Sequence, residues 1–197
     1  MRIGIFGGTF DPPHIGHLLA ASDAIDALAL DRVVFIPAAE QPLKAGMIVA
    51  SALDRLAMLG LVIRDDPRFS VDAIEIERGG LSFTVDTLRA LRDRWREDRE
   101  LALFLLLGQD VLGTLPKWRE PSAVGALAEL AILTRTGHSV EGNAVVGPQV
   151  GGGRIVPTRR VDVSSTEIRE RVAAGKSIHG FVPDAVLEYV AERRLYR

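Results

Sequence analysis

The chain is 197 residues long, within the size range of one ordinary domain. It is 47% hydrophobic and 25% charged, with a formal net charge of -2, so it lacks the positive excess of a general nucleic-acid or membrane-surface binder. With 0 cysteines, it can form neither disulfides nor thiolate metal sites.

The N-terminal segment is not predicted to be a signal peptide, because glycines and Asp11 interrupt its apolar stretch. The densest apolar run, Leu101–Leu107, is far too short to span a bilayer. We therefore expect a cytoplasmic protein with a single domain over residues 1–197 and with no nucleic-acid or membrane partner. A homo-oligomer is left open as an alternative to a monomer.

Strand-length apolar segments alternate with amphipathic helical segments along the chain. In chain order, the predicted elements are a strand at Arg2–Phe6, a helix at Pro12–Ala29, a strand at Arg32–Pro37, a helix starting at Ser51, a strand at Phe69–Ile76, a helix at Thr84–Glu97, strands at Leu101–Leu107, Glu129–Thr134 and Arg154–Pro157, a helix from Ser164 to near Gly175, and a helix at Pro183–Arg193. Asp11 suits the N-cap of the first helix and Pro12 its first position. Leu53 is expected on the apolar side of the second helix. Gly137–Gly153 is predicted to be a surface loop because of its six glycines.

This alternation predicts an α/β fold: a doubly wound, mainly parallel sheet with helices on both faces. Leu101–Leu107 is almost wholly apolar, as expected for a central strand covered on both sides. Ligands of such sheets bind outside the carboxyl ends of the strands, where the strand order reverses. Polar residues that directly follow the strands are therefore the candidates for a site.

The first candidate is the segment Gly7–His17, where the first strand turns into the first helix. Its glycines allow close approach of backbone to a ligand, and the helix N-terminus presents N–H groups to an anion. His14 and His17 share one helical face, and Gly16 between them is expected to leave room for a phosphate against both imidazoles. A tight turn with ordinary surface histidines is the alternative interpretation. A zinc site is disfavoured because no third ligand accompanies the pair.

The second candidate is the segment Ser164–Arg169. Three hydroxyls lie at a predicted helix N-terminus, with Arg169 one turn further on, which suits a chain of phosphates. Taken alone, Ser164 and Glu167 would indicate only a capping box beside a solvated arginine. Together with the histidine segment, they favour a nucleotide phosphate site. The chain has neither a P-loop motif nor G-x-G-x-x-G.

Both segments resemble the nucleotidyltransferase superfamily with an HIGH-type signature, which stands here as His14-Ile15-Gly16-His17. Class I aminoacyl-tRNA synthetases share those letters, but they are much longer and carry a KMSKS loop that is not found in this sequence. The segments that look like bacterial nicotinate mononucleotide adenylyltransferase are GGTFDPPHIGHL, RGGLSFTVDTL (Arg78–Leu88), GQDVLGTLPKW (Gly108–Trp118), VSSTEIRERV (Val163–Val172) and VPDAVLEYVAERRLY (Val182–Tyr196).

The resemblance implies roles for particular residues. His14, His17 and Arg169 would be catalytic, binding the ATP phosphates and stabilising the transition state. The ATP site would further include Gly7, Gly8, Thr9, Phe10, Lys44, Gly108, Asp110, Ser165 and Thr166. Thr84 and Trp118 would belong to the pyridine-nucleotide pocket. No protein metal ligand is implied, because Mg²⁺ would be bound mainly through the ATP phosphates.

Two positions depart from the family pattern: Leu43 stands where a histidine is usual, and Gln109 where a small residue is usual. The implied reaction joins nicotinate mononucleotide to the AMP half of ATP and releases pyrophosphate, a step of NAD biosynthesis. A sister adenylyltransferase acting on nicotinamide mononucleotide or phosphopantetheine is one alternative. A non-catalytic nucleotide sensor on the same fold is the other.

Overall fold

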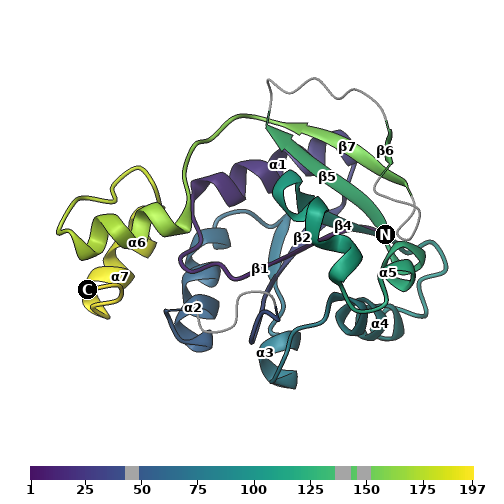
Figure 1. Ribbon diagram of the computed structural model, residues 1–197, viewed down its shortest axis with the longest axis horizontal. Helices are drawn as coiled ribbons and strands as arrows, with labels where there is room; N and C mark the ends of the chain where they lie inside the picture. The colour runs from purple at the N-terminus through teal and green to yellow at the C-terminus, as the bar shows by residue number, and fades with distance from the viewer. Residues whose placement is uncertain (43–48, 136–142, 146–151) are drawn as a thin grey trace.

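A computed structural model describes residues 1–42, 49–135, 143–145 and 152–197 (Figure 1). The strands are β1 (Arg2–Gly8), β2 (Arg32–Pro37), β3 (Phe69–Val71), β4 (Ala102–Gly108), β5 (Glu129–Arg135), β6 (Asn143–Val145) and β7 (Gly152–Thr158). The helices are α1 (Ile15–Leu28), α2 (Ala52–Ile63), α3 (Ile74–Arg78), α4 (Thr84–Arg94), the 3₁₀ helix η1 (Gln109–Lys117), α5 (Pro121–Leu127), α6 (Ser165–Ala173) and α7 (Asp184–Glu192).

The strands form one sheet in the order β3-β2-β1-β4-β5-β7-β6, in which only β6 runs antiparallel to its neighbour. From β1 the chain first moves outward through β2 to β3, and then returns to the other side of β1 for β4. The strand order therefore reverses between β1 and β4, and their carboxyl ends, Gly8 and Gly108, flank this point. A doubly wound, mainly parallel sheet is confirmed.

Alternate side chains of the central strands enter two different apolar clusters, as the two faces of a sheet require. Leu103 and Leu105 of β4 join a cluster with α4 and α5, whereas Phe104 and Leu106 join one with α1 and α2. The sheet is thus covered by helices on both faces.

A third cluster, the C-terminal cluster, lies beyond the sheet. It joins Met58 and Val62 of α2 to Ile168 of α6 and to Val186 and Val190 of α7. In Figure 1 the two C-terminal helices stand beside α1 and α2 at one end of the molecule. This packing fixes the start of α6 relative to the loop that follows β1.

The first helix begins later than predicted. It starts at Ile15 with His14 as its N-cap, and not at Pro12. Asp11 is not its N-cap, because the Asp11 carboxylate accepts hydrogen bonds from the backbone amides of Val49 and Ala50 instead. A tertiary contact has thus overridden a local capping preference.

The predicted strand at Phe69–Ile76 is wrong beyond Val71. The Asp72 carboxylate accepts a hydrogen bond from the amide of Ile74, and the chain turns there into α3. The prediction that Leu53 lies on the apolar side of the second helix is also wrong. Its side chain is 73% exposed, and α2 directs Met58 and Leu59 inward instead.

Other elements were not anticipated. Within the segment predicted as the Gly137–Gly153 loop, residues 143–145 form β6 and Gly152 begins β7; residues 136–142 and 146–151 lie outside the described part of the chain. The helices η1 and α5 follow β4 without a clear signal in the sequence.

Candidate nucleotide site

The ends of β1 and β4 provide the floor of the candidate site. Gly7 is exposed, and a Cβ built on it would meet nothing within 4 Å, so the strand end is open to a ligand. A Cβ on Gly108 would lie 2.5 Å from Oδ1 of Asp110. Glycine at this position therefore lets the exposed Asp110 carboxylate fold back over the strand end.

His14 and His17 stack on each other at the start of α1. Their ring centroids are 3.8 Å apart, with an interplanar angle of 28°. The backbone N–H of His14 donates to Nδ1 of His17 over 3.2 Å. Because Nδ1 is an acceptor, the proton of neutral His17 lies on Nε2, which leaves that N–H to donate to a ligand.

Gly16 has a different use from the one expected. A Cβ on Gly16 would lie 3.0 Å from Cε1 and Nδ1 of His14. The absence of a side chain thus makes room for the His14 ring, which is 8% exposed. Gly16 serves the stacking of the two histidines, and a bound phosphate would have to lie beyond that pair.

The ring of Phe10 packs against the ring of His17. The centroid of its ring is 5.0 Å from that of His17, and the side chain is only 3% exposed. Its backbone φ of 51° lies in the left-handed region, and the buried ring compensates for the strain. Any contact of Phe10 with ATP would therefore come from its backbone.

The pKa of His17 lies well below its usual value, first because burial disfavours the charged imidazole and second because His14 is beside it. Below pH ~6.5 the unfolded chain would bind a proton at this position that the folded protein does not bind. The free energy of unfolding should therefore fall as the pH falls, by at most about 1.4 kcal/mol per pH unit from this group.

Urea unfolding of wild type and His17→Gln between pH 7.5 and 5.5 tests this prediction. The glutamine variant should show the shallower pH dependence, because it has no group to protonate. Equal pH dependence in the two proteins would mean that His17 titrates near its ordinary value in the folded state.

The start of α6 meets the loop after β1. The Ser165 hydroxyl donates to the Pro12 carbonyl over 2.8 Å, and Nη1 of Arg169 donates to the Asp11 carbonyl over 2.7 Å. Ser164 caps the helix by accepting from the Glu167 amide, as predicted. The N-termini of α1 and α6 therefore converge, and both carry partial positive charge.

The remaining ATP-site candidates differ in their exposure and in their contacts. Thr9 is half-buried, and its carbonyl accepts a hydrogen bond of 2.8 Å from Nη1 of Arg55. Thr166 is exposed, and its hydroxyl accepts from Nη2 of Arg169 over 3.3 Å. Gly8 lies over the Phe10 ring, which a Cβ would approach to 3.0 Å. Lys44 and Leu43 lie outside the described residues.

The two pyridine-pocket candidates lie on neighbouring elements. Thr84 is the first residue of α4, and Trp118 directly follows η1. The indole of Trp118 is half-buried, packs against the cluster under α4 and α5, and donates from Nε1 to the Thr114 hydroxyl over 3.2 Å.

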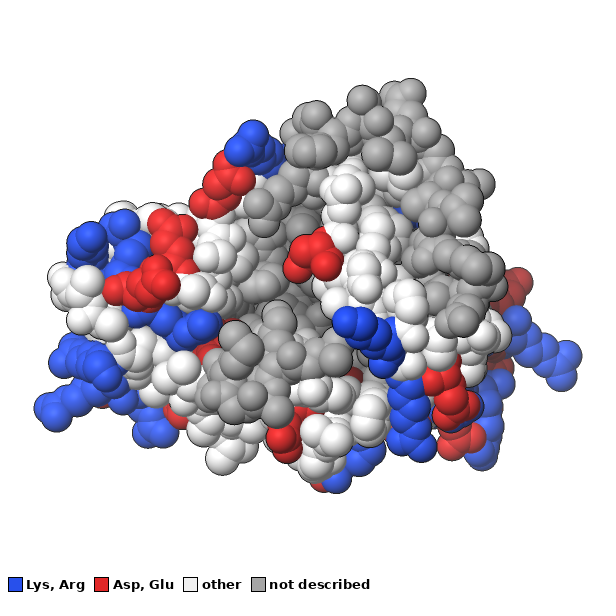
Figure 2. All heavy atoms as spheres, viewed as in Figure 1, with Lys and Arg blue, Asp and Glu red and all other residues white. Residues whose placement is uncertain are grey.

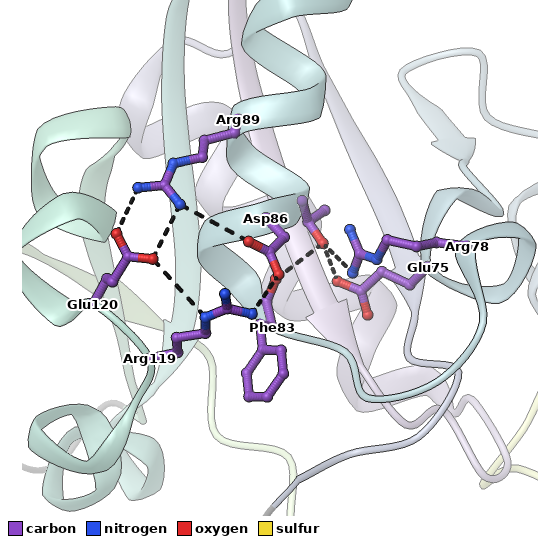
Figure 3. A network of polar contacts seen from close by, with 8 residues as sticks. Glu75, Arg78, Phe83, Asp86, Arg89, Arg119 and Glu120 are labelled. Atoms are coloured by element: carbon purple, nitrogen blue, oxygen red, sulfur yellow. Dashed lines mark hydrogen bonds and ion pairs between the residues drawn. The ribbon is translucent and has the colours of Figure 1, made fainter.

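Charged side chains connect these two elements (Figure 3). Asp86 and Arg89 of α4 face Arg119 and Glu120, the residues that follow Trp118. Arg89 contacts both oxygens of Glu120, over 3.1 and 2.6 Å, and Nη1 of Arg119 lies 3.2 Å from Asp86. This ion-pair cluster holds the Trp118 segment against the helix that begins at Thr84.

Around the site, Figure 2 shows the surface hollowed between the C-terminal helices and the body of the sheet, with basic and acidic side chains both present over α6 and α7. Among the described residues, no group of three or more His, Cys, Asp or Glu could hold a metal ion. The described part of the chain also has no helix long and apolar enough to cross a membrane.

Sequence reasoning missed three residues that support the site. Arg55 is 1% exposed and bonds to the carbonyls of Thr9 and Ala39. The carboxylate of Asp11 and the hydroxyl of Tyr196 bond to each other over 2.8 Å. An arginine in an amphipathic helix and a tyrosine after the last helix carry no local signal of such roles.

Comparison with known proteins agrees with this geometry. The family model of cytidylyltransferase-like proteins matches residues 5–171. A "probable nicotinate-nucleotide adenylyltransferase" of Gemmatimonas aurantiaca is 50% identical over 200 aligned residues, which cover 100% of this chain and 93% of the relative. A protein of the same description from Roseiflexus sp. is 44% identical over 198 residues, which cover 99% of this chain and 98% of the relative.

A solved structure of Plasmodium falciparum nicotinic acid mononucleotide adenylyltransferase in complex with NaAD has the same fold, with a TM-score of 0.78 at 17% identity. The match covers 99% of this chain and 97% of that chain. On the sequence relationship over the full chain, the protein belongs to the nicotinate-nucleotide adenylyltransferase family of cytidylyltransferase-like proteins.

Proposed function

We propose that this protein transfers the adenylyl group of ATP to nicotinate mononucleotide, giving nicotinate adenine dinucleotide and pyrophosphate, a step of NAD biosynthesis in the cytoplasm. The observation that carries the proposal is the stacked pair His14 and His17, which follows the loop whose Asp11 carbonyl accepts from Arg169, where two helix N-termini converge at the reversal of the strand order. The names of the relatives support the choice of substrates.

In this proposal ATP lies across the ends of β1 and β4. Gly7, Gly8 and Thr9 let the phosphates approach the backbone, while Ser165, Thr166 and Arg169 bind the triphosphate from the other side. Asp110 would accept hydrogen bonds from the ribose hydroxyls, which its exposed carboxylate can do. Lys44 would add a further positive charge near the phosphates.

The nucleophile would be a 5′-phosphate oxygen of the mononucleotide. It forms a bond to the α-phosphorus of ATP, and the bond from that phosphorus to the α–β bridging oxygen breaks, so that the electron pair leaves with pyrophosphate. A phosphate monoester has a second pKa of roughly 6 and is mostly dianionic at neutral pH, so no general base is needed. The protein's task is alignment and stabilisation of negative charge, for which Nε2–H of His17 and the guanidinium of Arg169 are suited.

Mg²⁺ would arrive with ATP as part of the substrate and neutralise phosphate charge. The donors near the described strand ends are hydroxyls, N–H groups and a guanidinium, which suit phosphate oxygens, and the described residues offer no group of three or more His, Cys, Asp or Glu for a metal ion. We therefore expect the phosphates and water to provide most of the metal ligands.

Trp118 should affect the second substrate selectively. Trp118→Ala is expected to raise KM for the mononucleotide about tenfold, because an aromatic face that stacks on the pyridine ring would be lost. KM for ATP should change little. Initial-rate kinetics with each substrate varied in turn would measure both, and Trp95→Ala, which removes the chain's other tryptophan at the far end of α4, serves as the control. Equal changes in both KM values would argue against a pyridine contact.

The direct test is turnover by purified protein with Mg²⁺-ATP and either nicotinate or nicotinamide mononucleotide, with dinucleotide and pyrophosphate quantified. A strong preference for nicotinate is expected. Preference for nicotinamide would keep the chemistry and overturn the specificity. ATP binding without dinucleotide from either substrate would favour the sister transferase acting on phosphopantetheine, or a sensor.

A further inference from the structure

Beneath the loop between β1 and α1, a buried carboxylate accepts three hydrogen bonds from two distant parts of the chain. Asp11 is 3% exposed. Its Oδ2 accepts from the amide of Val49 over 2.8 Å, and its Oδ1 accepts from the amide of Ala50 over 3.1 Å and from the hydroxyl of Tyr196 over 2.8 Å. These contacts are called the Asp11 hub below.

Tyr196 reaches the hub from the C-terminal cluster. It is 8% exposed and packs with residues of α2 and α7. Burial, and then the neighbouring Asp11 carboxylate, raise the pKa of the Tyr196 hydroxyl above its usual value. The hydroxyl therefore keeps its proton at physiological pH and remains a donor.

The backbone of the same aspartate holds a candidate catalytic group. The Asp11 carbonyl accepts the hydrogen bond from Nη1 of Arg169, while the next residue, Pro12, accepts from the hydroxyl of Ser165. Further along the loop lies His14, which stacks on His17. The position of Asp11 therefore sets the positions of both Arg169 and the histidine pair.

We propose that Asp11 and Tyr196 are positioning residues for ATP: Tyr196 fixes the Asp11 carboxylate, and Asp11 fixes Arg169 and the loop that leads to His14. This inference rests on the proposed function. Neither side chain touches the substrate. Their effect is to keep the phosphate-binding groups in one geometry.

Loss of a single hydrogen bond to the Asp11 carboxylate should lower the rate strongly. A buried carboxylate is stable only while its oxygens are hydrogen-bonded, and loss of one donor leaves charge that is poorly compensated. The Asp11 carboxylate could then be solvated only if the loop that carries it moved toward water. Small displacements of aligned catalytic groups lower rates severely.

Tyr196→Phe removes one oxygen atom from the hub and is the decisive variant. Tyr189→Phe is a matched control, because its hydroxyl also donates to a carboxylate, that of Asp54, over 2.9 Å. Asp54 bonds to Ser51 and Arg193 instead of to the loop after β1.

In Tyr196→Phe we expect kcat/KM for ATP to fall about tenfold, with KM for the mononucleotide within about twofold of wild type. Affinity for a non-hydrolysable ATP analogue, measured by calorimetry, should fall in parallel. The amides of Val49 and Ala50 should exchange hydrogen faster. Tyr189→Phe should match wild type in all three measurements.

Wild-type kinetics and analogue binding in a folded Tyr196→Phe protein would overturn the inference, as would equal losses in both tyrosine variants. Asp11→Asn, which removes the charge and keeps the side-chain shape, should reproduce the losses and provides the same test if Tyr196→Phe does not fold. Failure of wild type to make dinucleotide would overturn the proposed function, whereas the amide exchange measures the hub independently.

Discussion

His17→Ala should lower kcat by about 10²–10³-fold and leave the protein folded. The expected size is that of losing one preorganised donor to charge that develops in the transition state. In this protein the donor is prepared in the ground state, because the His14 amide occupies Nδ1 and thereby directs the imidazole proton to Nε2. Burial keeps the ring neutral, so its donor function does not depend on protonation near neutral pH.

Steady-state kinetics at saturating ATP and mononucleotide measure this loss, with circular dichroism to verify folding. His179→Ala is the matched control, since His179 is exposed and lies 3.3 Å from Asp184, at the start of α7. The control should retain wild-type turnover. A folded His17→Ala protein with turnover close to wild type would remove His17 from the mechanism.

Arg169→Ala should lower kcat/KM for ATP by about 10²-fold, because a charged hydrogen-bond donor to the triphosphate is lost. Loss of its bond to the Asp11 carbonyl should add to the effect by loosening the loop. Arg169→Lys should recover only part of the activity, since an ammonium keeps the charge but cannot bind two oxygens in a fixed fork.

Arg171→Ala is the control for Arg169 on the same helix. Its side chain bonds to the Ser177 carbonyl and covers the Phe181 ring, whereas the Arg169 guanidinium bonds to the Asp11 carbonyl. Rates measured across a range of ATP concentrations should be unchanged in this control. The same unchanged rates in Arg169→Ala would refute a role in ATP binding or turnover.

The sheet was predictable because its strands are defined by continuous apolar runs. Ala102–Gly108 and Arg32–Pro37 lie where the pattern indicated, since a central parallel strand must be apolar on both faces. The start of α1 was not predictable in the same way. Asp11 and Pro12 are good local signals for a helix start, but Asp11 forms bonds with residues 38 and 39 positions away, which no local rule contains.

The candidate site also has features that the sequence pattern predicts and features that only tertiary contacts determine. The contact between the two candidate segments, Gly7–His17 and Ser164–Arg169, could be expected, because strand-end residues gather at one edge of a parallel sheet. The bond from the guanidinium of Arg55 to the Thr9 carbonyl and the bond from the Tyr196 hydroxyl to Asp11 depend on side-chain packing between distant segments. These features follow from tertiary structure, and the sequence pattern has no period that encodes them.

The bonds from Ser165 to Pro12 and from Arg169 to Asp11 span 153 and 158 positions of the chain. During synthesis, which proceeds at about 5–20 residues per second, the histidine loop would leave the ribosome many seconds before its partner helix. A nascent chain that had already formed β1 to β5 would thus contain a folded sheet edge without Ser165, Thr166 and Arg169, three of the groups proposed to bind phosphate. Nucleotide capture would begin only when α6 docks, so ATP would select for molecules whose last helices have already folded.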